Sequence, residues 1–574
     1  MNQKVVVVGA VALGPKVACR LKRLDPEAEV TLIDKDRYIS YGGCGIPYYV
    51  GGDVTELEGL YSTSAHVPRD AKYFENVKGV RVKIRTEAIS IDRKGKAIRI
   101  RDLETGMEED LPYDKLVLAT GARPVIPPIP GTKLPGVFVV SSLHDAKAIK
   151  DRISRGLVEN AVVIGGGAIG LEMAEALTDL WGIETTLVEM MDQLVPTAFG
   201  RDMALVMKNQ MEGKGVRVLL RERVMEILGN ETDGIRAIVT DQREIPCDLV
   251  VLAVGVKPYT DLAGDAGLAV GRSGGILVDQ RMRTSDPDIF AGGDCVEILH
   301  LVSGEYIPMP LGSLANRQGR VIGTNLAGGH ERFAGTVGTF CVKIFDLTVA
   351  RAGLTEKQAL ETGFDAVHAT VVQADRAHFY PTMKLMYVKL IADRRTRRVL
   401  GIEAAGWQGD AVKARVDAVA VMLPLKADVN DISNLEVAYA PPFASAMDIV
   451  NNAANSLDNI ISGRHETIDV IDFLERFKSG RKRVLDVRSP VQAGPFVEKY
   501  PDRWLNINQE ELSARLDEVP GDEPLFLVCG SGPRSYESQL LLRQKGINAQ
   551  TLNIQGGIGM ILMSDPEFAP EGYK

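Results

Sequence analysis

The sequence predicts an α/β protein of several domains, and three observations support that prediction. Residues 4–34 and residues 161–189 each have the pattern of a short strand, a glycine-rich turn, a helix and a second strand that ends at an acidic residue. A third and smaller α/β pattern begins beyond about residue 463. The chain of 574 residues is long enough for about three to five domains with buried cores.

Composition and charge exclude several classes of protein. The chain has 67 basic and 76 acidic side chains, and the net charge of −9 argues against nucleic acid as the main partner. It contains no uninterrupted apolar run of about 18 residues, which argues against a membrane-spanning helix. The six cysteines lie far apart, and no histidine pair has metal-ligand spacing with a cysteine. We therefore predict no disulfide framework, no metal site and a reducing, cytoplasmic location.

The first of the two repeated patterns is a Rossmann-like dinucleotide-binding unit. We predict a strand at 4–8, a helix after the turn and a second strand at 29–33. Gly9 permits a tight turn, Gly14 lets the helix pack close to the sheet, and Asp34 can accept hydrogen bonds from a ribose. The free N–H groups at the start of the helix suit a pyrophosphate. The candidate cofactor-binding residues of this unit are Gly9, Val11, Ala12, Gly14, Asp34, Lys35 and Ser40.

The second pattern repeats the unit with all three glycines of the usual motif. A strand at 161–164 precedes the turn, a helix extends to about Trp181, and a strand at 184–188 ends at Glu189. A carboxylate at this point favours a ribose without a phosphate, so we expect NADH rather than NADPH. Two such units imply two dinucleotides, and a flavin with a nicotinamide is the most economical pair. The candidate residues are Gly165, Gly167, Ala168, Ile169, Gly170, Glu189 and Gly255.

Two later strands also end in glycine-containing turns. The first is predicted at 115–119 and the second at 285–290, just before Gly293 and Asp294. Glycine lets the backbone approach a ligand closely, which leaves the Asp294 carboxylate available for a hydroxylated chain. The candidate residues of these turns are Ala119, Thr120, Gly121, Arg123, Gly293 and Asp294.

Together these motifs resemble those of the pyridine nucleotide–disulfide oxidoreductases over residues 1–460. The resemblance implies that the first unit holds FAD, with Asp294 on its ribitol chain, and that the second holds the nicotinamide nucleotide. It also implies an α/β dimerisation domain. The domain boundaries that we expect are 1–155 and 281–330 for the FAD-binding domain, 156–280 for the NAD(P)H-binding domain, 331–462 for the dimerisation domain and 463–574 for the last domain.

Cys44 stands alone in the segment where family members that reduce dithiol substrates carry two cysteines. A single redox cysteine cannot close an internal disulfide, so its oxidised form is a mixed disulfide, a persulfide or a sulfenic acid. Pro47 suits the first turn of a helix and thereby places Cys44 near a helix N-terminus. Because a thiolate is stabilised there, we expect the pKa of the Cys44 thiol to be lowered.

The segment around Cys44 resembles that of the coenzyme A-disulfide reductases, with Gly43 in place of their asparagine. In those enzymes two tyrosines of the partner subunit reach the substrate, and Tyr380 and Tyr439 are the matching positions. A phenolic hydroxyl at that point can donate a proton to a leaving thiolate. The resemblance therefore implies a homodimer whose interface supplies tyrosines to each site. The residues that match around the cysteine are Ser40, Cys44, Gly45, Pro47 and Tyr48.

Several basic residues stand out against the acidic composition of the chain. Coenzyme A carries a 3′-phosphate and a pyrophosphate, which require such cations. A solvated basic helix face is an alternative that we weigh equally. The candidate coenzyme A-binding residues are Arg20, Lys22, Arg23, Ser40, Arg69 and Lys72.

The last region resembles a single rhodanese domain. The matching features are the triplet 486–488, the Cys-x4-Arg loop from Cys529 to Arg534, and the glycine pair 556–557. Cys529 follows a predicted buried strand and is surrounded by loop N–H groups at a helix N-terminus, which suits an anionic persulfide. Arg534 adds a fixed positive charge to this candidate catalytic loop.

The fusion of the two modules predicts an FAD-dependent NAD(P)H reductase of coenzyme A persulfide, polysulfide or coenzyme A disulfide. Cys44 would attack the sulfur substrate, and Cys529 would accept or deliver sulfane sulfur, with coenzyme A or another small thiol as the carrier. A rival hypothesis is an NADH oxidase or peroxidase that uses a Cys44 sulfenic acid. We also consider a sulfurtransferase whose flavin half senses redox state, and a flavoprotein scaffold without catalysis.

Overall fold

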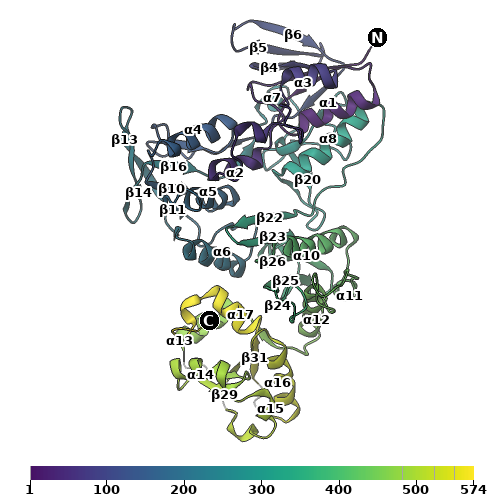
Figure 1. Cartoon of the computed structure of the whole chain (residues 1–574). Coiled ribbons are helices and arrows are strands. Elements are labelled where there is room, and N and C mark those ends of the chain that lie inside the picture. Colours follow the sequence, from purple (N-terminus) through teal and green to yellow (C-terminus); the bar gives the residue numbers. More distant parts are fainter. Residues whose placement is uncertain (1, 481–482, 522–523, 548–549, 574) are drawn as a thin grey trace. The chain divides into compact units, whose positions relative to one another are not determined.

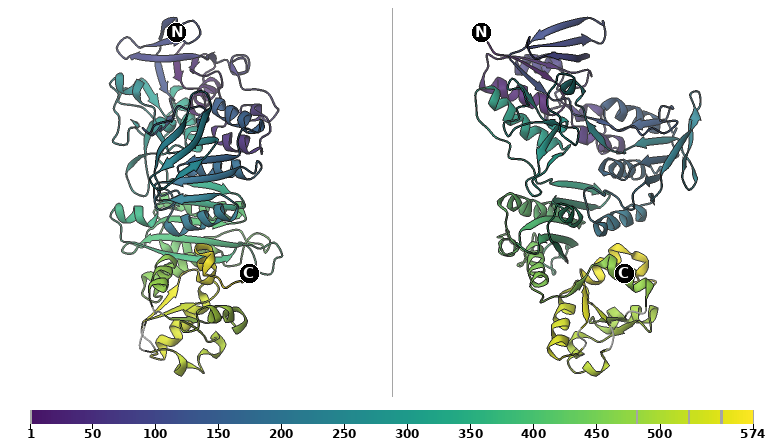
Figure 2. Two further views of the ribbon diagram at one scale, coloured as in Figure 1. Left: turned by 90° about the vertical axis from the view of Figure 1, so that its left-hand side faces the viewer. Right: turned by 180° about the vertical axis from the view of Figure 1, so that it is seen from behind.

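The computed structural model describes residues 2–480, 483–521, 524–547 and 550–573. The chain forms two compact units (Figure 1; Figure 2). The first comprises Met1–Met190 and Gly215–Thr336, and the second comprises Met191–Lys214 and Val337–Lys574. Across the described ranges, no helix has the length and apolar character needed to cross a membrane.

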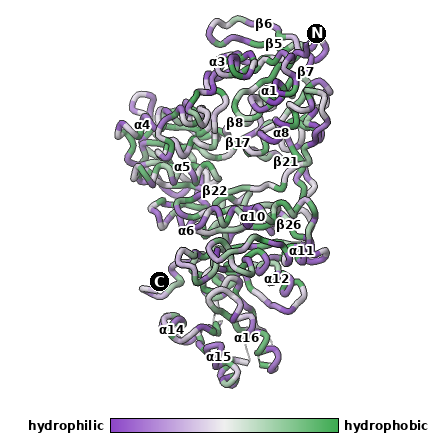
Figure 3. Tube along the Cα trace, turned by 45° about the vertical axis from the view of Figure 1, so that its right-hand side comes forward, coloured by the Kyte–Doolittle hydropathy of each residue, from purple (hydrophilic) through white to green (hydrophobic). Residues whose placement is uncertain are grey.

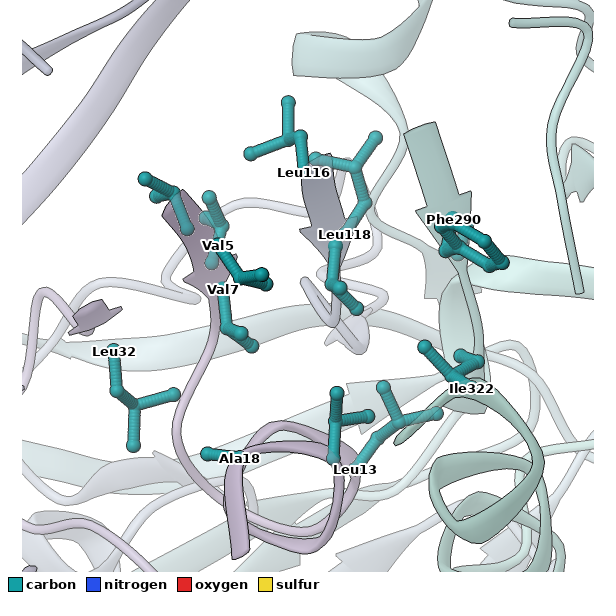
Figure 4. Close-up of a cluster of buried hydrophobic side chains, with 14 of the residues drawn as sticks. Val5, Val7, Leu13, Ala18, Leu32, Leu116, Leu118, Phe290 and Ile322 are labelled. Atoms are coloured by element: carbon teal, nitrogen blue, oxygen red, sulfur yellow. The ribbon is translucent and has the colours of Figure 1, made fainter. Parts of the chain in front are cut away.

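The first unit contains a parallel sheet with the strand order β19-β7-β1-β2-β3. Its strands are β1 (Lys4–Val8), β2 (Glu29–Ile33), β3 (Arg81–Lys83), β7 (Lys115–Leu118) and β19 (Ile289–Ala291). Helices α1 (Leu13–Leu24) and α8 (Gly312–Leu326) pack against each other beside this sheet. Figure 4 shows the buried side chains that join the helices to the strands, among them Val5, Val7, Leu13, Ala18, Leu32, Leu116, Leu118, Phe290 and Ile322.

A second parallel sheet of this unit has the order β12-β11-β10-β16-β9. Its strands are β9 (Val137–Val139), β10 (Asn160–Ile164), β11 (Glu184–Glu189), β12 (Arg217–Leu220) and β16 (Leu249–Leu252). Helix α5 (Ala168–Thr178) follows the glycine-rich turn after β10, and α4 (Leu143–Ser154) packs against β9. Both predicted βαβ units are therefore confirmed as strand, turn, helix and parallel strand.

Smaller elements complete the first unit. An antiparallel meander consists of β4 (Thr86–Asp92), β5 (Ala97–Asp102) and β6 (Glu108–Pro112), and a second one of β13 (Val224–Asn230), β14 (Gly234–Thr240) and β15 (Glu244–Pro246). The remaining strands are β8 (Ala122–Pro124), β17 (Val256–Pro258), β18 (Ile276–Leu277), β20 (Val296–Leu299) and β21 (Tyr306–Pro308). The remaining helices are α2 (Ile46–Gly51), α3 (Ala71–Tyr73) and α7 (Asp261–Asp265).

Two predicted elements differ from the structure by more than one residue at an end. The helix expected to reach Trp181 ends at Thr178, because the chain turns there and Gly182 N–H donates to the Thr178 carbonyl at 3.1 Å. The strand expected at 285–290 is only β19, since Pro287 lies in a turn in which Ile289 N–H donates to the Asp286 carbonyl at 3.1 Å.

The second unit contains an antiparallel sheet with the order β22-β23-β26-β25-β24. Its strands are β22 (Phe340–Ile344), β23 (Leu347–Gly353), β24 (Ala366–Ala374), β25 (Leu385–Asp393) and β26 (Val399–Gly406). Strand β26 is buried along its whole length and is rich in hydrophobic residues (Figure 3). The accompanying helices are α6 (Arg201–Gly213), α9 (Glu356–Glu361), α10 (Gly409–Met422), α11 (Val429–Ser433) and α12 (Ile449–Ile461).

The C-terminal part of the second unit is a small parallel sheet with the order β27-β31-β30-β28-β29. Its strands are β27 (Thr467–Ile468), β28 (Arg483–Asp486), β29 (Trp504–Asn506), β30 (Leu525–Val528) and β31 (Thr551–Ile554). The helices are α13 (Val470–Ser479), α14 (Pro490–Lys499), α15 (Gln509–Leu512), α16 (Pro533–Gln544) and α17 (Gly557–Ser564). The predicted additional α/β region is thus confirmed, and the buried strand expected directly before Cys529 is β30.

A buried ion pair stabilises this C-terminal sheet. Arg488 Nη2 lies 2.7 Å from Asp486 Oδ2, and both side chains are almost completely buried. Trp504 Nε1 donates to the same carboxylate oxygen at 3.0 Å, and Arg488 Nη1 donates to the Tyr573 hydroxyl at 2.7 Å. These hydrogen bonds compensate the free-energy cost of burying the two charges. The triplet 486–488 therefore belongs to the buried core of this sheet.

Candidate active site

Cys44 lies in a single 3-10 turn, Gly43–Gly45, that leads directly into helix α2. Pro47 occupies the first turn of α2, as predicted, where its missing N–H costs no hydrogen bond. A Cβ atom added to Gly312 would lie 3.9 Å from Cys44 Sγ. The sulfur therefore faces the first residue of helix α8.

The expectation of a lowered pKa for the Cys44 thiol is wrong. Although the residue is exposed at the surface of its unit, partial desolvation of the thiol raises its pKa, and the carboxyl groups of Glu172 and Asp294 raise it further. The opposing effect of the local backbone N–H is smaller. Desolvation is the largest cause; in addition, α2 is short, whereas two acidic groups lie within electrostatic range of the sulfur.

Glu172 is a residue that the sequence interpretation missed. It lies in α5, and burial raises the pKa of its carboxyl group to about 7, with a further contribution from Glu175. Burial also raises the pKa of Asp294 to about 6. The available signal was the position of Glu172, two residues after the last glycine of the second motif, in the first turns of α5.

The first glycine-rich turn has the close packing that its motif predicts. Gly9 has φ +105°, and a Cβ atom on Gly14 would lie 1.9 Å from the Gly9 carbonyl oxygen, so a side chain there would collide with the backbone. Asp34 Oδ2 accepts a hydrogen bond from Ala10 N–H at 2.7 Å. Val11 and Ala12 form the bend between this turn and α1. The acidic residue thus holds the turn in place.

The second turn repeats this construction. A Cβ atom on Gly170 would lie 1.9 Å from the Gly165 carbonyl oxygen, and Glu189 Oε2 accepts a hydrogen bond from Gly166 N–H at 2.7 Å. Ala168 and Ile169 begin α5. In contrast, a Cβ atom on Gly167 or Gly255 would have no neighbour within 4 Å. The backbone at these two glycines therefore borders open space, as a cofactor would require.

The other predicted residues around the first sheet have diverse surroundings. Ser40 is buried with φ +51°, and its N–H donates to the Ala10 carbonyl at 2.7 Å. Ala119 N–H donates to the Val8 carbonyl at 2.8 Å, and Thr120 Oγ1 donates to the Tyr259 carbonyl at 2.6 Å. These contacts fix the ends of β1 and β7 beside the first turn.

The remaining predicted residues of this group differ in exposure. Gly121 has φ +69° and Gly293 has φ +76°, so both need the freedom of glycine. Lys35 is exposed, with its ammonium 5.2 Å from the centre of the Tyr259 ring. Arg123 forms an exposed ion pair with Asp261 at 2.8 Å, so its charge is already partly compensated.

The five basic residues predicted for coenzyme A are not all available to a ligand in the same way. Arg20 Nε donates to Thr324 Oγ1 at 3.0 Å, and Lys22 Nζ donates to the Ala28 carbonyl at 3.0 Å. Arg69 Nε donates to the Tyr61 carbonyl at 3.3 Å. Arg23 at the end of α1 and Lys72 in α3 are exposed to solvent, so these two cations are the more accessible to a phosphate.

Tyr380 and Tyr439 lie in two loops of the second unit that contact each other. The first loop follows β24 and the second precedes α12. Ala377 N–H of the first donates to the Pro441 carbonyl of the second at 3.2 Å. Tyr439 is 52% exposed, and its loop also carries an exposed Phe443. The structure therefore brings the two predicted loops together on the surface of this unit.

Cys529 is buried at the end of β30, and the loop 530–532 joins it to α16. Its Sγ accepts hydrogen bonds from Gly532 N–H at 3.1 Å and from the Ser535 hydroxyl at 3.3 Å. A Cβ atom on Gly530 would lie 3.6 Å from Arg534 Nη2, so the Arg534 guanidinium lies over the same loop. Ser535 was not among the predicted site residues, although it directly follows the Cys-x4-Arg pattern.

A family model for the pyridine nucleotide-disulphide oxidoreductases matches residues 3–310, and a model for their dimerisation domain matches residues 339–450. The chain belongs to this family. It is therefore an NAD(P)H-dependent oxidoreductase of a flavoprotein family, with a dimerisation domain. Within the described residues, no group of three or more His, Cys, Asp or Glu side chains is placed to hold a metal ion.

Individual members of the family are similar over most of their length. An NAD(P)H coenzyme A polysulfide/persulfide reductase of Pyrococcus horikoshii is 34% identical over 448 residues, which are 78% of this chain and 97% of the relative. An NADH oxidase of Methanocaldococcus jannaschii is 34% identical over 451 residues, which are 79% of this chain and 98% of the relative. The structure of an NAD-dependent persulfide reductase from A. fulgidus, 39% identical, superposes with a TM-score of 0.91 and covers 97% of this chain and 100% of its own.

Proposed function

We propose that this enzyme is an FAD-dependent NAD(P)H reductase of coenzyme A persulfide, polysulfide or coenzyme A disulfide, and that Cys44 is its redox-active residue. The observation that carries the proposal is a lone cysteine that faces the start of α8 and lies within electrostatic range of Glu172 and Asp294. The similarity to the Pyrococcus horikoshii and A. fulgidus reductases supports the choice of a persulfide substrate.

The residues of the first unit fit the two dinucleotides. Asp294 is largely buried and has no hydrogen-bond or ion-pair partner within the described part of the chain, so its carboxylate can accept hydrogen bonds from the hydroxyl groups of a ribitol chain. Glu189 and the open backbone at Gly167 would hold NADH, with the N–H groups at the start of α5 toward the pyrophosphate. FAD, when bound, would accept a hydride from the nicotinamide and supply two electrons to a sulfur–sulfur bond.

The sulfur chemistry belongs to Cys44. Its thiolate attacks one sulfur of R–S–SH or R–S–S–R, a Cys44 sulfur–sulfur bond forms, and hydrosulfide or RS⁻ leaves. Two electrons then cleave the new bond, which releases the remaining sulfur or thiol and restores the Cys44 thiolate. Tyr380 and Tyr439 of the second subunit of a homodimer would donate a proton to the leaving sulfur. Because the pKa of the Cys44 thiol is raised, a smaller fraction of it is the attacking thiolate at a given pH than for an unperturbed thiol.

We also propose that the C-terminal sheet is a rhodanese domain that handles sulfane sulfur. The Gly532 N–H and the Ser535 hydroxyl, which contact Cys529 Sγ, would stabilise the negative charge of a Cys529 thiolate or persulfide, and Arg534 would contribute positive charge. Coenzyme A, bound with help from Arg20, Lys22, Arg23, Ser40, Arg69 and Lys72, would carry sulfur between Cys529 and Cys44. Sulfur transfer in either direction is consistent with these contacts.

The domain boundaries remain part of this proposal. They are 1–155 and 281–330 for FAD, 156–280 for NAD(P)H, 331–462 for dimerisation and 463–574 for the rhodanese domain. A test of the rhodanese assignment is thiocyanate formation from thiosulfate and cyanide in the absence of NADH. Loss of this activity in the Cys529→Ser variant, with NADH-dependent disulfide reduction retained, is the result that the assignment predicts. Equal thiocyanate formation by both proteins would overturn it.

A second candidate function is an NADH oxidase or peroxidase that cycles through a Cys44 sulfenic acid. The NADH oxidase of Methanocaldococcus jannaschii, which is as similar as the persulfide reductase, favours it. The two functions can be distinguished by two rates of NADH consumption. One is measured with air or peroxide as the oxidant, and the other with coenzyme A persulfide under exclusion of oxygen. We expect the persulfide to be the faster oxidant, because a rhodanese domain has no role in oxygen reduction. Faster consumption with oxygen would favour the oxidase.

A further inference from the structure

We propose that Arg415 of α10 is the positioning residue that sets the two tyrosine loops relative to each other. Residues 375–384 are called the Tyr380 loop and residues 436–448 the Tyr439 loop. The inference rests on the proposed function, in which both tyrosines act on the sulfur substrate. Within the described residues Arg415 forms no hydrogen bond with either tyrosine; it bonds to the backbone of the loops that carry them.

Arg415 is buried, with 6% of its surface exposed, and it contacts both loops. Its Nη2 lies 3.1 Å from the Asp375 carbonyl oxygen at the base of the Tyr380 loop and 3.2 Å from the Phe443 carbonyl oxygen in the Tyr439 loop. Its Nη2 and Nε also donate to Asp448 Oδ2 at 2.8 and 3.1 Å. One guanidinium group thus joins helix α10, the Tyr380 loop and the Tyr439 loop.

The carboxylate of Asp448 holds the guanidinium group of Arg415 in place. It is the N-cap residue of α12, and its Oδ1 accepts a hydrogen bond from Val450 N–H at 3.1 Å while Oδ2 accepts from Arg415. A buried cation without this carboxylate would be strongly unfavourable. The carboxylate therefore orients Arg415 and starts α12 at the end of the Tyr439 loop.

Among the residues that the structure describes, the other hydrogen bonds of the loops do not connect both of them to one element outside the loops, although Gln373 Nε2 of β24 donates to the Met447 carbonyl of the Tyr439 loop at 2.9 Å. The Tyr380 loop is closed at its base, where Lys384 N–H donates to Asp375 Oδ1 at 2.8 Å. Two hydrogen bonds join the loops directly, from Ala377 N–H to the Pro441 carbonyl at 3.2 Å and from Ser445 Oγ to the Arg376 carbonyl at 3.1 Å. Neither of these two bonds involves the sheet or its helices, and the Gln373 contact holds only the Tyr439 loop, whereas Arg415 ties both loops to α10.

The chemistry of the contact requires arginine. The planar guanidinium presents several N–H groups in a fixed fork, so it can serve Asp448 and two carbonyl groups at once. A lysine ammonium could keep the charge pair with Asp448, but it would not hold both carbonyl groups in the same geometry. A displacement of either loop by about 1 Å would misplace its phenolic hydroxyl and can lower a rate by about a hundredfold.

The test uses the full-length holoenzyme and compares Arg415→Lys and Asp448→Asn with wild type. Asp448→Asn keeps an N-cap acceptor for α12 and so provides a second, milder variant. The matched control is Lys413→Gln, which removes an exposed ion pair with Asp417 from the same helix. Each variant is also made in a Tyr380→Phe/Tyr439→Phe background. The readouts are flavin reduction by NADH and kcat and KM with coenzyme A disulfide and coenzyme A persulfide.

We expect Arg415→Lys to lower kcat about 10- to 100-fold with unchanged flavin reduction, and to have little further effect once both tyrosines are phenylalanine. Asp448→Asn should lower kcat in the same way but by a smaller factor. Lys413→Gln should have the kcat of the wild type. If the loss is equal in both tyrosine backgrounds, or if flavin reduction falls in parallel, the positioning role of Arg415 is wrong, while the proposed role of the tyrosines is unaffected. Wild-type turnover of the Tyr380→Phe/Tyr439→Phe enzyme would instead refute the proposed role of the tyrosines, and with it that of Arg415.

Discussion

The imidazole of His368 lies 3.3 Å from the carboxylate of Asp469, the N-cap residue of helix α13. Its other ring nitrogen lies 2.8 Å from Glu356 Oε1. Lys389, on the neighbouring strand, is buried beside Asp202 at 3.2 Å. His368 belongs to β24 of the antiparallel sheet and Asp469 to the C-terminal region, so a buried ion pair joins these two parts of the second unit.

This pair predicts a pH-dependent attachment of the C-terminal region. Burial and Lys389 lower the pKa of His368, but the hydrogen bonds to Asp469 and Glu356 outweigh them and raise it to about 9. The ordinary value is about 6.5. The contribution of the pair is therefore fully present below about pH 6.5 and is lost as the pH rises through about 9. We expect it to be on the order of 2 kcal/mol at neutral pH.

Hydrogen exchange of α13 and β24 measures this effect. His368→Gln should lower the protection of both elements at neutral pH, and the difference from wild type should shrink above about pH 9. His144→Gln is the control, because His144 is half-exposed and pairs with Asp36 in the other unit. A difference that stays constant over this pH range would show that the charge of His368 does not contribute.

Removing the charge of Glu172 should make Cys44 more reactive. Glu172 raises the pKa of the Cys44 thiol, and its own pKa is about 7, so its effect grows as the pH rises above 7. In Glu172→Gln, alkylation of Cys44 by iodoacetamide above neutral pH should accelerate by up to about tenfold. Glu184→Gln, an exposed position on β11, is the control, and Cys44→Ser gives the background rate. An unchanged pH profile would contradict the electrostatic link.

The Ser535 hydroxyl should contribute to the chemistry of Cys529. A hydrogen bond of this kind is worth about 0.5–1.5 kcal/mol, so Ser535→Ala should slow thiocyanate formation from thiosulfate and cyanide by about 2- to 10-fold. Ser538→Ala is a close control, because Ser538 is buried in the same helix but donates to the Arg534 carbonyl at 2.8 Å. If both variants form thiocyanate at the wild-type rate, Ser535 has only a structural role.

The parts of the fold that depend on local sterics could be predicted from the sequence. Gly9 and Gly14 must be glycine because a Cβ atom would meet the backbone of the same unit, and strand, turn and helix follow one another along the chain. The bounds of β1 and β2 agree with the prediction for the same reason. Cys44 could be singled out because it is the lone cysteine between glycines next to Pro47.

The electrostatics of the site depend on residues that are distant in the sequence, so the sequence did not predict the raised pKa of the Cys44 thiol. The pKa of Cys44 is raised by burial of the thiol and further by Glu172 and Asp294, which α5 and the turn after β19 bring into range, and no local pattern shows these effects. The same limit applies to Arg415, whose contacts join two loops and a helix N-cap. These relationships exist only in the folded chain.

The most direct test of the proposed mechanism is substrate turnover in the Cys44→Ser variant. We predict that this protein retains FAD and that NADH still reduces the flavin, because neither dinucleotide-binding turn is changed. Its NADH-dependent reduction of coenzyme A persulfide and coenzyme A disulfide should fall by several orders of magnitude, since no thiolate remains to attack the sulfur substrate. Turnover close to the wild-type rate with either substrate would contradict the assignment of Cys44 as the redox-active residue.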